Sequence, residues 1–393
     1  MDEKSVARDP LVDGGRETVC MHYGEHRLAH GGAAAPPLYQ SSTFVYPDAE
    51  AYDRRYLPQS PYYDYTRQSN PTTAVLETKL AKLEVGSWAR CFGSGMGAIT
   101  CAISACVGAG EHVVAIDNCY PPTHDYLGEY LKRFNVSTTF VRGTDPAAFI
   151  AAMRDETRVL YLESPMWGRL ELLELAPLVE AARSRSIVTI FDNSWATPVF
   201  QNPLALGCDI VVHSATKYLG GHSDTLGGVA IGQDPELGAK LAKEAELLGA
   251  VLDPFAAWLM LRSLRSLVPR MQQHQQSGLA VARLLAEHPR VQQVFYPGLE
   301  SHPQHELAKR QMRGFSSVFS FALEDQSREA THRFINGLRL FSIGCSWGGH
   351  ESLATGGTLF DRNSTKPMWL IRLHIGLETT EDLLADVRQA LED

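Results

Sequence analysis

The sequence lacks a long apolar run, a long basic run and any Cys-x-x-Cys pair. No stretch has the length of a membrane span, and residues 1–10 lack the apolar core of a signal peptide, so we expect a cytoplasmic protein without a membrane partner. The formal net charge is -9, from 36 Lys and Arg against 45 Asp and Glu. This balance argues against a nucleic-acid partner, and we interpret it as a contribution to solubility.

Cysteine is scarce, and the seven cysteines are an odd number. In a chain of this length they are expected to be reduced thiols that pack mostly as small hydrophobes. Cys101 and Cys106 lie in a stretch rich in Ala and Ile, which fits burial. We predict no metal site.

The chain has 393 residues, which is more than one hydrophobic core usually serves. Residues 1–66 are rich in Pro, Gly, Tyr and polar residues and show little periodicity. We expect an arm there that contacts a neighbouring subunit, with a partly disordered terminus as the alternative. Residues 67–262 are expected to form the larger domain and residues 263–393 a smaller one.

The larger domain is predicted to be α/β. Short, β-branched, nearly all-apolar segments are expected to be strands buried on both faces, namely Val113–Ile116, Thr139–Val141, Val159–Leu162, Ile187–Phe191, Ile210–Val212 and Val229–Ile231. Helical stretches such as Leu172–Arg185 lie between them. This alternation predicts βαβ units and a mostly parallel sheet, which binds ligands at the carboxyl ends of its strands.

The smaller domain is predicted to be α+β. A long polar helix, Met271–His288, precedes strands at Val291–Tyr296, Ser317–Phe321 and Leu370–Ile375. Thr380 is expected to be the N-cap of a last helix that ends at Leu391.

Two strand ends carry groups that suit an anion and a cation. A glycine-rich turn, Cys91-Phe-Gly-Ser-Gly-Met-Gly97, runs into a helix at Ala98–Val107. Backbone N–H groups at such a helix start bind phosphate, although glycine turns before helices are common. Asp192 ends an apolar strand, where a carboxylate needs a cation or several donors. It is a candidate partner for a protonated pyridine nitrogen, with a helix N-cap or a buried salt bridge as alternatives.

Two further strand ends carry basic side chains. Lys217 follows the strand Asp209–Val212, flanked by hydroxyls and glycines. A desolvated lysine there has a lowered pKa and acts as a nucleophile, unless it snorkels to the surface. Ser214 and Thr216 make another phosphate-binding element plausible. Arg372 alternates with apolar residues and needs an anionic partner, either a substrate carboxylate or a structural salt bridge. Together the four motifs meet the needs of a pyridoxal-phosphate (PLP) enzyme acting on an amino acid.

At this point the sequence resembles the Cys/Met-metabolism family of PLP enzymes, in the fold type I group. The resemblance runs from about Gly31 to the C-terminus. Its motifs are Ser214-Ala-Thr-Lys217-Tyr followed by Gly-His-Ser-Asp224, Tyr65-Thr-Arg67 with Asn70-Pro-Thr72, and Glu163-Ser-Pro165. It implies a seven-stranded, mostly parallel sheet flanked by helices, a smaller C-terminal domain and an extended N-terminal arm.

By this resemblance, Lys217 binds PLP as a Schiff base, Asp192 pairs with the pyridinium nitrogen and Tyr120 stacks on the ring. Either Lys217 or Tyr120 is the catalytic base. The remaining contacts of this chain with the cofactor reach its phosphate, and they come from Gly95, Met96, Ser214 and Thr216.

The resemblance also implies a homo-oligomer, usually a tetramer built from dimers with shared active sites. Tyr65 and Arg67 are then expected to reach the phosphate of the adjacent subunit. Ser346, Trp347 and Arg372 are expected to contact the amino-acid substrate, together with Tyr120.

Within the family, the motifs Ser346-Trp-Gly-Gly349, Arg372-Leu-His-Ile-Gly376 and Asp192-Asn-Ser-Trp195 are more similar to those of cystathionine β-lyase than to those of the γ-enzymes. That resemblance implies β-elimination of cystathionine, or a related cysteine S-conjugate, to homocysteine, pyruvate and ammonia. The alternatives are γ-elimination or γ-replacement on cystathionine or a homoserine-derived amino acid, and a PLP-binding protein without turnover.

Three residues and one segment depart from the family pattern. Trp167 replaces an asparagine of the γ-enzymes, His350 replaces an aromatic residue, and Cys345 precedes Ser346. The segment between Glu351 and Arg372 is shortened. All are expected near the substrate mouth, where they leave a different leaving group open.

Overall fold

The computed structural model describes residues 14–57, 60–359 and 367–392. The N-terminal segment that was interpreted as lacking a signal peptide falls outside these ranges. So does part of the shortened segment between Glu351 and Arg372.

The larger sheet has seven strands in the order β1-β7-β6-β5-β4-β2-β3. Strands β2 to β6 are parallel to one another, and β7 runs antiparallel to both β6 and β1. The predicted mostly parallel, seven-stranded sheet is therefore confirmed. The strands are β1 (Trp88–Phe92), β2 (His112–Ile116), β3 (Ser137–Val141), β4 (Thr157–Glu163), β5 (Val188–Asp192), β6 (Ile210–His213) and β7 (Gly228–Gly232).

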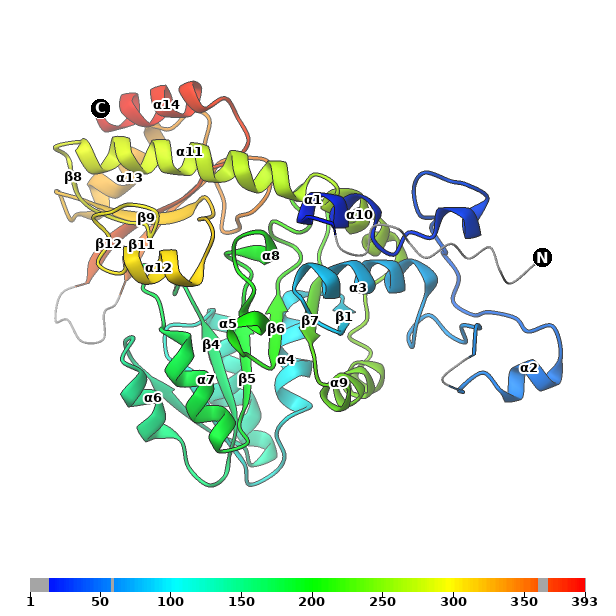
Figure 1. Ribbon diagram of the computed structural model, residues 1–393. Coiled ribbons are helices and arrows are strands. Elements are labelled where there is room, and N and C mark those ends of the chain that lie inside the picture. The colour runs from blue at the N-terminus through cyan, green and yellow to red at the C-terminus, as the bar shows by residue number, and fades with distance from the viewer. Residues whose placement is uncertain (1–13, 58–59, 360–366, 393) are drawn as a thin grey trace.

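Helices flank this sheet on both sides (Figure 1), which is why β2, β6 and β7 are buried along their whole length. Several helices start at an Asx-Pro pair, as at Asn70-Pro71 and Asp253-Pro254, where the side chain caps the helix and proline fits the first turn. The helices of residues 67–264 are α3 (Pro71–Leu83), α4 (Gly95–Ser104), α5 (Pro121–Asp125), α6 (Pro146–Ala152), α7 (Leu175–Ser184), α8 (Thr197–Phe200), α9 (Pro235–Leu248) and α10 (Pro254–Leu264), with the short turns η3 (Tyr126–Tyr130), η4 (Leu131–Phe134) and η5 (Pro203–Leu206).

The second sheet has five strands in the order β10-β11-β12-β9-β8. They are β8 (Val291–Phe295), β9 (Val318–Leu323), β10 (Ser342–Ile343), β11 (Leu353–Leu359) and β12 (Met368–His374). The helices that accompany them are α11 (Leu267–Glu287), α12 (His305–Gln311), α13 (Arg328–Gly337) and α14 (Thr380–Glu392). Thr380, expected to be an N-cap, is instead the first residue of α14. The boundaries at residues 66 and 262 stay predictions.

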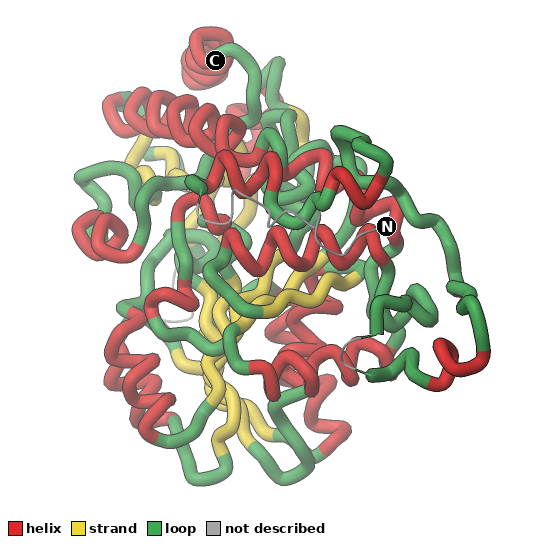
Figure 2. Tube along the Cα trace, turned by 45° about the vertical axis from the view of Figure 1, so that its right-hand side comes forward, coloured by secondary structure: helices red, strands yellow, loops and turns green. Residues whose placement is uncertain are grey.

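The N-terminal segment has two parts that behave differently. Helix α1 (Arg16–His22) packs against α3 and α11, and Val19 and Cys20 are buried in the core of this chain. Helix α1 therefore packs on the body of this chain and does not extend from it as an arm. The chain then passes through η2 (Arg27–His30) and extends away from the body through α2 (Ala49–Asp53), as Figures 1 and 2 show.

The cysteines are all free, and five of the seven are buried. Cys101 is buried, Cys106 is partly exposed and Cys345 is exposed. Within the described ranges, no helix combines the length and apolar content needed to cross a bilayer, and no group of His, Cys, Asp and Glu could hold a metal ion.

Candidate active site

One edge of the seven-stranded sheet collects most of the predicted site residues. Because β7 is antiparallel to both β1 and β6, β1 points the same way as β2 to β6. The carboxyl ends of six strands therefore lie at one edge, where such sheets bind ligands. The groups that follow these ends are Gly95 and Met96 after β1, Tyr120 after β2, Glu163 on β4, Asp192 on β5, and Ser214, Thr216 and Lys217 after β6.

Asp192 is a buried carboxylate that suits a cationic ligand. The backbone N–H of Ser194 donates to its Oδ1 over 2.9 Å. Burial raises the pKa of Asp192, while hydrogen bonds from Ser194 and the charges of His213 and Lys217 lower it. A protonated ring nitrogen beside this carboxylate would offset its burial.

Glu163 is a second carboxylate at this edge, directly beside Asp192 in the register of β4 and β5. Burial, and then the charge of Asp192, raises the pKa of Glu163 to about 8. The backbone N–H of Tyr120 donates to Glu163 Oε2 over 2.9 Å. Glu163 appeared in the sequence only as part of a family motif, and its position against Asp192 required the strand register.

Lys217 is half-buried, and its amine points toward the C-terminal part of the chain. Its Nζ donates to Ser346 Oγ over 2.8 Å and lies 5.2 Å from the centre of the Trp347 ring. Burial lowers the pKa of Lys217, and the positive charge of Arg372 lowers it further. The environment therefore favours the neutral, nucleophilic amine over a surface cation.

The start of α4 forms an anion cradle. Ser94 caps the helix, since its Oγ accepts from Gly97 N over 3.0 Å and its carbonyl accepts from Ala98 N. Among the described residues, the N–H groups of Gly95 and Met96 have no acceptor. A Cβ at position 95 would lie 2.8 Å from Ser214 Cβ and 2.9 Å from Ser214 Oγ. Only glycine leaves this space between the helix start and the Ser214 hydroxyl.

Thr216 has a different local role from the neighbouring Ser214. Its Oγ1 donates to the carbonyl of Gly227 and accepts from Gly227 N, both over 3.1 Å. These two bonds fasten the connection between β6 and β7, so the Thr216 hydroxyl is engaged within the protein.

Arg372 projects from β12 toward the segment that contains Ser346. Its Nη2 donates to the carbonyls of Cys345 over 2.8 Å and Ser346 over 3.1 Å. Burial lowers the pKa of Arg372. No carboxylate among the described residues pairs with it, which gives no support to a structural salt bridge. The guanidinium has further N–H donors for a carboxylate ligand.

A close backbone contact joins the loop of Ser346 and Trp347 to the segment of Lys217. Gly348 has φ +85°, and a Cβ there would lie 2.7 Å from Tyr218 N and 2.9 Å from the Lys217 carbonyl carbon. The N–H of Gly348 donates to Nε2 of the buried His374 over 3.1 Å. The loop with Ser346 and Trp347 thus lies directly on the Lys217 backbone. The Ser346-Trp-Gly-Gly349 motif contains Gly348, but its contact with Lys217 could not be predicted from that motif.

Three predicted cofactor residues have exposed side chains, namely Tyr120, Tyr65 and Arg67. Tyr120 is 49% exposed and touches the site through its backbone N–H. Tyr65, 46% exposed, lies at the end of the extended arm, where Arg67 is 5.7 Å from its ring. Within the described part of the chain, neither arm residue is brought to Lys217.

The positions that depart from the family pattern are exposed. The carbonyl of Trp167 accepts from Asn118 Nδ2 over 2.6 Å, and its side chain is exposed. The exposed His350 has its Nδ1 3.3 Å from Oε2 of Glu351. Cys345 is exposed next to the backbone groups that Arg372 holds.

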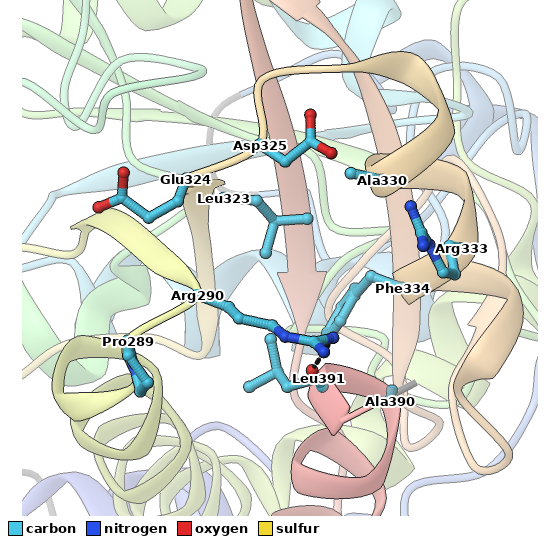
Figure 3. A pocket seen from close by; sticks show the side chains of 10 residues that line it. All are labelled: Pro289, Arg290, Leu323, Glu324, Asp325, Ala330, Arg333, Phe334, Ala390 and Leu391. Atoms are coloured by element: carbon cyan, nitrogen blue, oxygen red, sulfur yellow. Dashed lines mark hydrogen bonds between the residues drawn. The ribbon is translucent and has the colours of Figure 1, made fainter.

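A separate hollow of about 280 Å³ lies in the C-terminal region. Its walls come from the turn before β8, the end of β9 with the residues after it, α13 and α14, and Figure 3 shows Arg290 reaching across toward Leu391. None of its lining residues belongs to the sheet edge around Lys217. The chemistry of the strand ends, and not this hollow, identifies the candidate active site.

The residues at the sheet edge fit PLP. The cradle of Gly95, Met96 and Ser214 suits its phosphate, the buried Asp192 suits its ring nitrogen, and the Lys217 amine, with its lowered pKa, suits its aldehyde.

Comparisons with known proteins agree with this fit. The family model described as Cys/Met metabolism PLP-dependent enzyme matches residues 17–392. A cystathionine gamma-synthase of Mycobacterium tuberculosis is 39% identical, over 96% of this chain and 97% of the relative. An L-methionine gamma-lyase of Fusobacterium nucleatum is 38% identical, over 96% and 98%, and a cystathionine gamma-lyase of Bacillus subtilis is 37% identical, over 96% and 99%.

Among solved structures, the crystal structure of metB from Corynebacterium glutamicum superposes with a TM-score of 0.89 and 32% identity, covering 97% of this chain and 98% of that one. The fold type I architecture and the PLP cofactor are thereby confirmed. These matches show that the chain belongs to the Cys/Met-metabolism family of PLP-dependent enzymes.

Proposed function

We propose that this chain acts at the γ-carbon of sulfur amino acids, by γ-elimination or γ-replacement on cystathionine or a homoserine-derived amino acid. The observation that carries the proposal is the Lys217 amine, held 2.8 Å from Ser346 Oγ and under the positive charge of Arg372. The relatives favour this alternative over the β-lyase interpretation, since their names describe γ-synthases and γ-lyases.

Two basic residues divide the work on the substrate. When bound, PLP withdraws electrons from the α-carbon of the amino acid. Arg372 has N–H donors left to hold the substrate carboxylate, and its carbonyl partners at Cys345 and Ser346 fix the plane of the guanidinium. The Lys217 amine takes the α-proton, a role that its lowered pKa supports because burial and Arg372 both disfavour its cationic form.

Reaction at the γ-carbon requires proton transfers at both the α- and β-carbons, whereas β-elimination requires only the first. A base that reaches both neighbouring carbons suits this chemistry. Lys217 suits this role, because among the described residues Ser346 Oγ is the one hydrogen-bond partner of its Nζ. Tyr120, 49% exposed on the same edge, remains the other candidate base.

The other predicted residues hold the cofactor in this proposal. Gly95, Met96 and Ser214 bind its phosphate, and Asp192 accepts from its ring nitrogen. Thr216 secures the loop that carries Lys217 through its bonds to Gly227.

Tyr65 and Arg67 are proposed to complete the site of a neighbouring subunit in a homotetramer built from dimers. Their exposure on an arm that leaves the body fits this role.

β-Elimination of cystathionine is the second candidate, favoured by the surroundings of Lys217. Trp347, in the motif that resembles β-lyase, lies with its ring centre 5.2 Å from Lys217 Nζ. It also packs on Tyr218, with ring centres 5.5 Å apart. An aromatic wall at this point narrows the space beside the amine.

Identification of the products tests the two candidates. The PLP-loaded protein is incubated with L-cystathionine, and separately with an O-acylated homoserine plus cysteine. Cysteine with 2-oxobutyrate in the first case, or cystathionine in the second, is the expected result. Pyruvate with homocysteine would replace the γ-proposal by the β-lyase reading. Absence of all these products would exclude both substrates.

A further inference from the structure

A buried carboxylate outside the cofactor edge contacts the structure around Asp192. Glu84, at the end of α3, is fully buried. It accepts from His213 Nε2 over 2.7 Å, from Asn193 Nδ2 over 2.7 Å and from Asn202 Nδ2 over 3.0 Å. A carboxyl group that accepts from three N–H groups and donates to none has the bonding pattern of an ionised carboxylate.

Two of these donors flank Asp192. Asn193 follows it in the chain, and His213 ends β6, the strand paired with β5. The backbone N–H of Asn193 also donates to the Val212 carbonyl over 3.0 Å. Glu84 therefore fixes the residue after Asp192 and the end of the neighbouring strand at the same time.

His213 is oriented by this contact. Its Nε2 carries the proton that Glu84 accepts, and its Nδ1 is buried without a hydrogen-bond partner among the described residues. Burial is the largest influence on the pKa of Asp192 and raises it, while the interaction with His213 is among those that lower it. Other titratable groups that interact electrostatically with Asp192 are Lys217, Glu163, Tyr161 and Cys119.

We propose that Glu84 and His213 form a positioning pair that holds Asp192 in place opposite the ring nitrogen of the cofactor. The inference rests on the proposed role of Asp192 and extends it to two residues that do not touch the cofactor. Glu84 orients the His213 ring through their hydrogen bond, and His213 ends the strand that is paired with β5.

The chain offers a matched control in another buried carboxylate. Glu25 accepts from Lys79 Nζ over 2.8 Å and from Arg265 Nη2 over 3.1 Å, and it is as buried as Glu84. It joins the N-terminal segment to α3 and α10 and has no contact with Asp192. Loss of its charge perturbs the fold by the same physical means as loss of the Glu84 charge.

The experiment compares Glu84→Gln, His213→Gln and Glu25→Gln with Asp192→Asn as the reference. His213→Gln keeps an N–H donor for Glu84 but removes the imidazole. The measurements on the PLP-loaded proteins are the dissociation constant of PLP, the pH dependence of the visible absorbance and the thermal midpoint. Glu84→Gln and His213→Gln are expected to weaken PLP retention about tenfold, the factor that one pKa unit represents, and to change the absorbance in the direction of Asp192→Asn.

The controls separate the possible failures. Glu25→Gln is expected to lower the thermal midpoint and leave PLP retention unchanged. If Glu84→Gln and His213→Gln behave like Glu25→Gln while Asp192→Asn releases PLP, the positioning pair is wrong and the role of Asp192 stands. If Asp192→Asn retains PLP normally, the proposed role of Asp192 itself is wrong. Should Glu84→Gln fail to fold, His213→Gln decides the question.

Discussion

The cofactor half and the substrate half of the site are built by different means. The cofactor half consists of strand ends and a helix start, so Asp192, Ser214 and Gly95 are placed by the hydrogen-bond ladder of a buried sheet. The substrate half is a loop, residues 344–349, held by carbonyl bonds to Arg372 and by the close approach of Gly348. In the proposed site, the residues assigned to the cofactor therefore lie on rigid elements, whereas those assigned to the substrate lie on a loop, where sequence changes are tolerated more easily. The departures at Cys345 and His350 fall in or beside that segment.

Removal of Lys217 tests the cofactor half most severely. Lys217→Ala is expected to abolish the yellow absorbance of the PLP-loaded protein and to lower turnover by about 10³-fold or more, because the nucleophile and the base are lost together. Absorbance spectra and product assays measure both effects. The exposed Lys309→Ala serves as the control. Full activity in Lys217→Ala would refute the assignment.

Removal of Arg372 tests the substrate half. Arg372→Ala is expected to raise KM about a hundredfold, equivalent to about 3 kcal/mol for a lost charged partner, while PLP binding changes little. Steady-state kinetics and PLP titration separate these effects. Arg333→Ala, at the remote hollow of Figure 3, is the matched control. Dominant loss of PLP in Arg372→Ala would mean that Arg372 is structural.

The anion cradle is tested by two glycines on one helix. Gly95→Ala brings a methyl group within 2.8 Å of Ser214 Cβ, so PLP affinity is expected to fall about tenfold. Gly97→Ala meets its nearest neighbours only at 3.4 Å, and the added methyl group favours the helix. Equal PLP affinities in the two variants would show that the cradle does not bind the phosphate.

The smallest expected effect is the electrostatic influence of Arg372, in the substrate half, on the pKa of Lys217. Burial and Arg372 lower the pKa of Lys217, so the amine loses its proton at a lower pH than an ordinary lysine. In the PLP-free protein, Schiff-base formation with pyridoxal should therefore reach its half-maximal rate below the ordinary lysine pKa. Arg372→Ala should move that midpoint upward but leave it lowered, because burial is the larger cause. An unchanged midpoint would show that the two halves are not coupled.

The apolar strands and the strand-end residues could be predicted because burial on both faces leaves a clear sequence pattern. β1, with Arg90 and Trp88, and the glycine-containing β11 lack this pattern and were not predicted. Lys217, Asp192 and the glycine-rich turn that contains Gly95 were predicted as site elements from local chemistry. The contacts of Glu84 with His213 and of Gly348 with Lys217 join residues far apart in the chain, so no local pattern could indicate them.

The antiparallel placement of β7 has a consequence for where the chain can be opened. The connection from β6 to β7 starts and ends at the same edge, and the Thr216–Gly227 bonds close it like the base of a hairpin. Lys217 is consequently tethered from both sides. A circular permutant with new termini between Gly221 and Leu226 would retain every residue of the site. Its Lys217 would, however, be joined covalently only to β6 and no longer to β7. The position of the reactive amine is thus expected to depend on an unbroken backbone across this connection as well as on the lysine side chain.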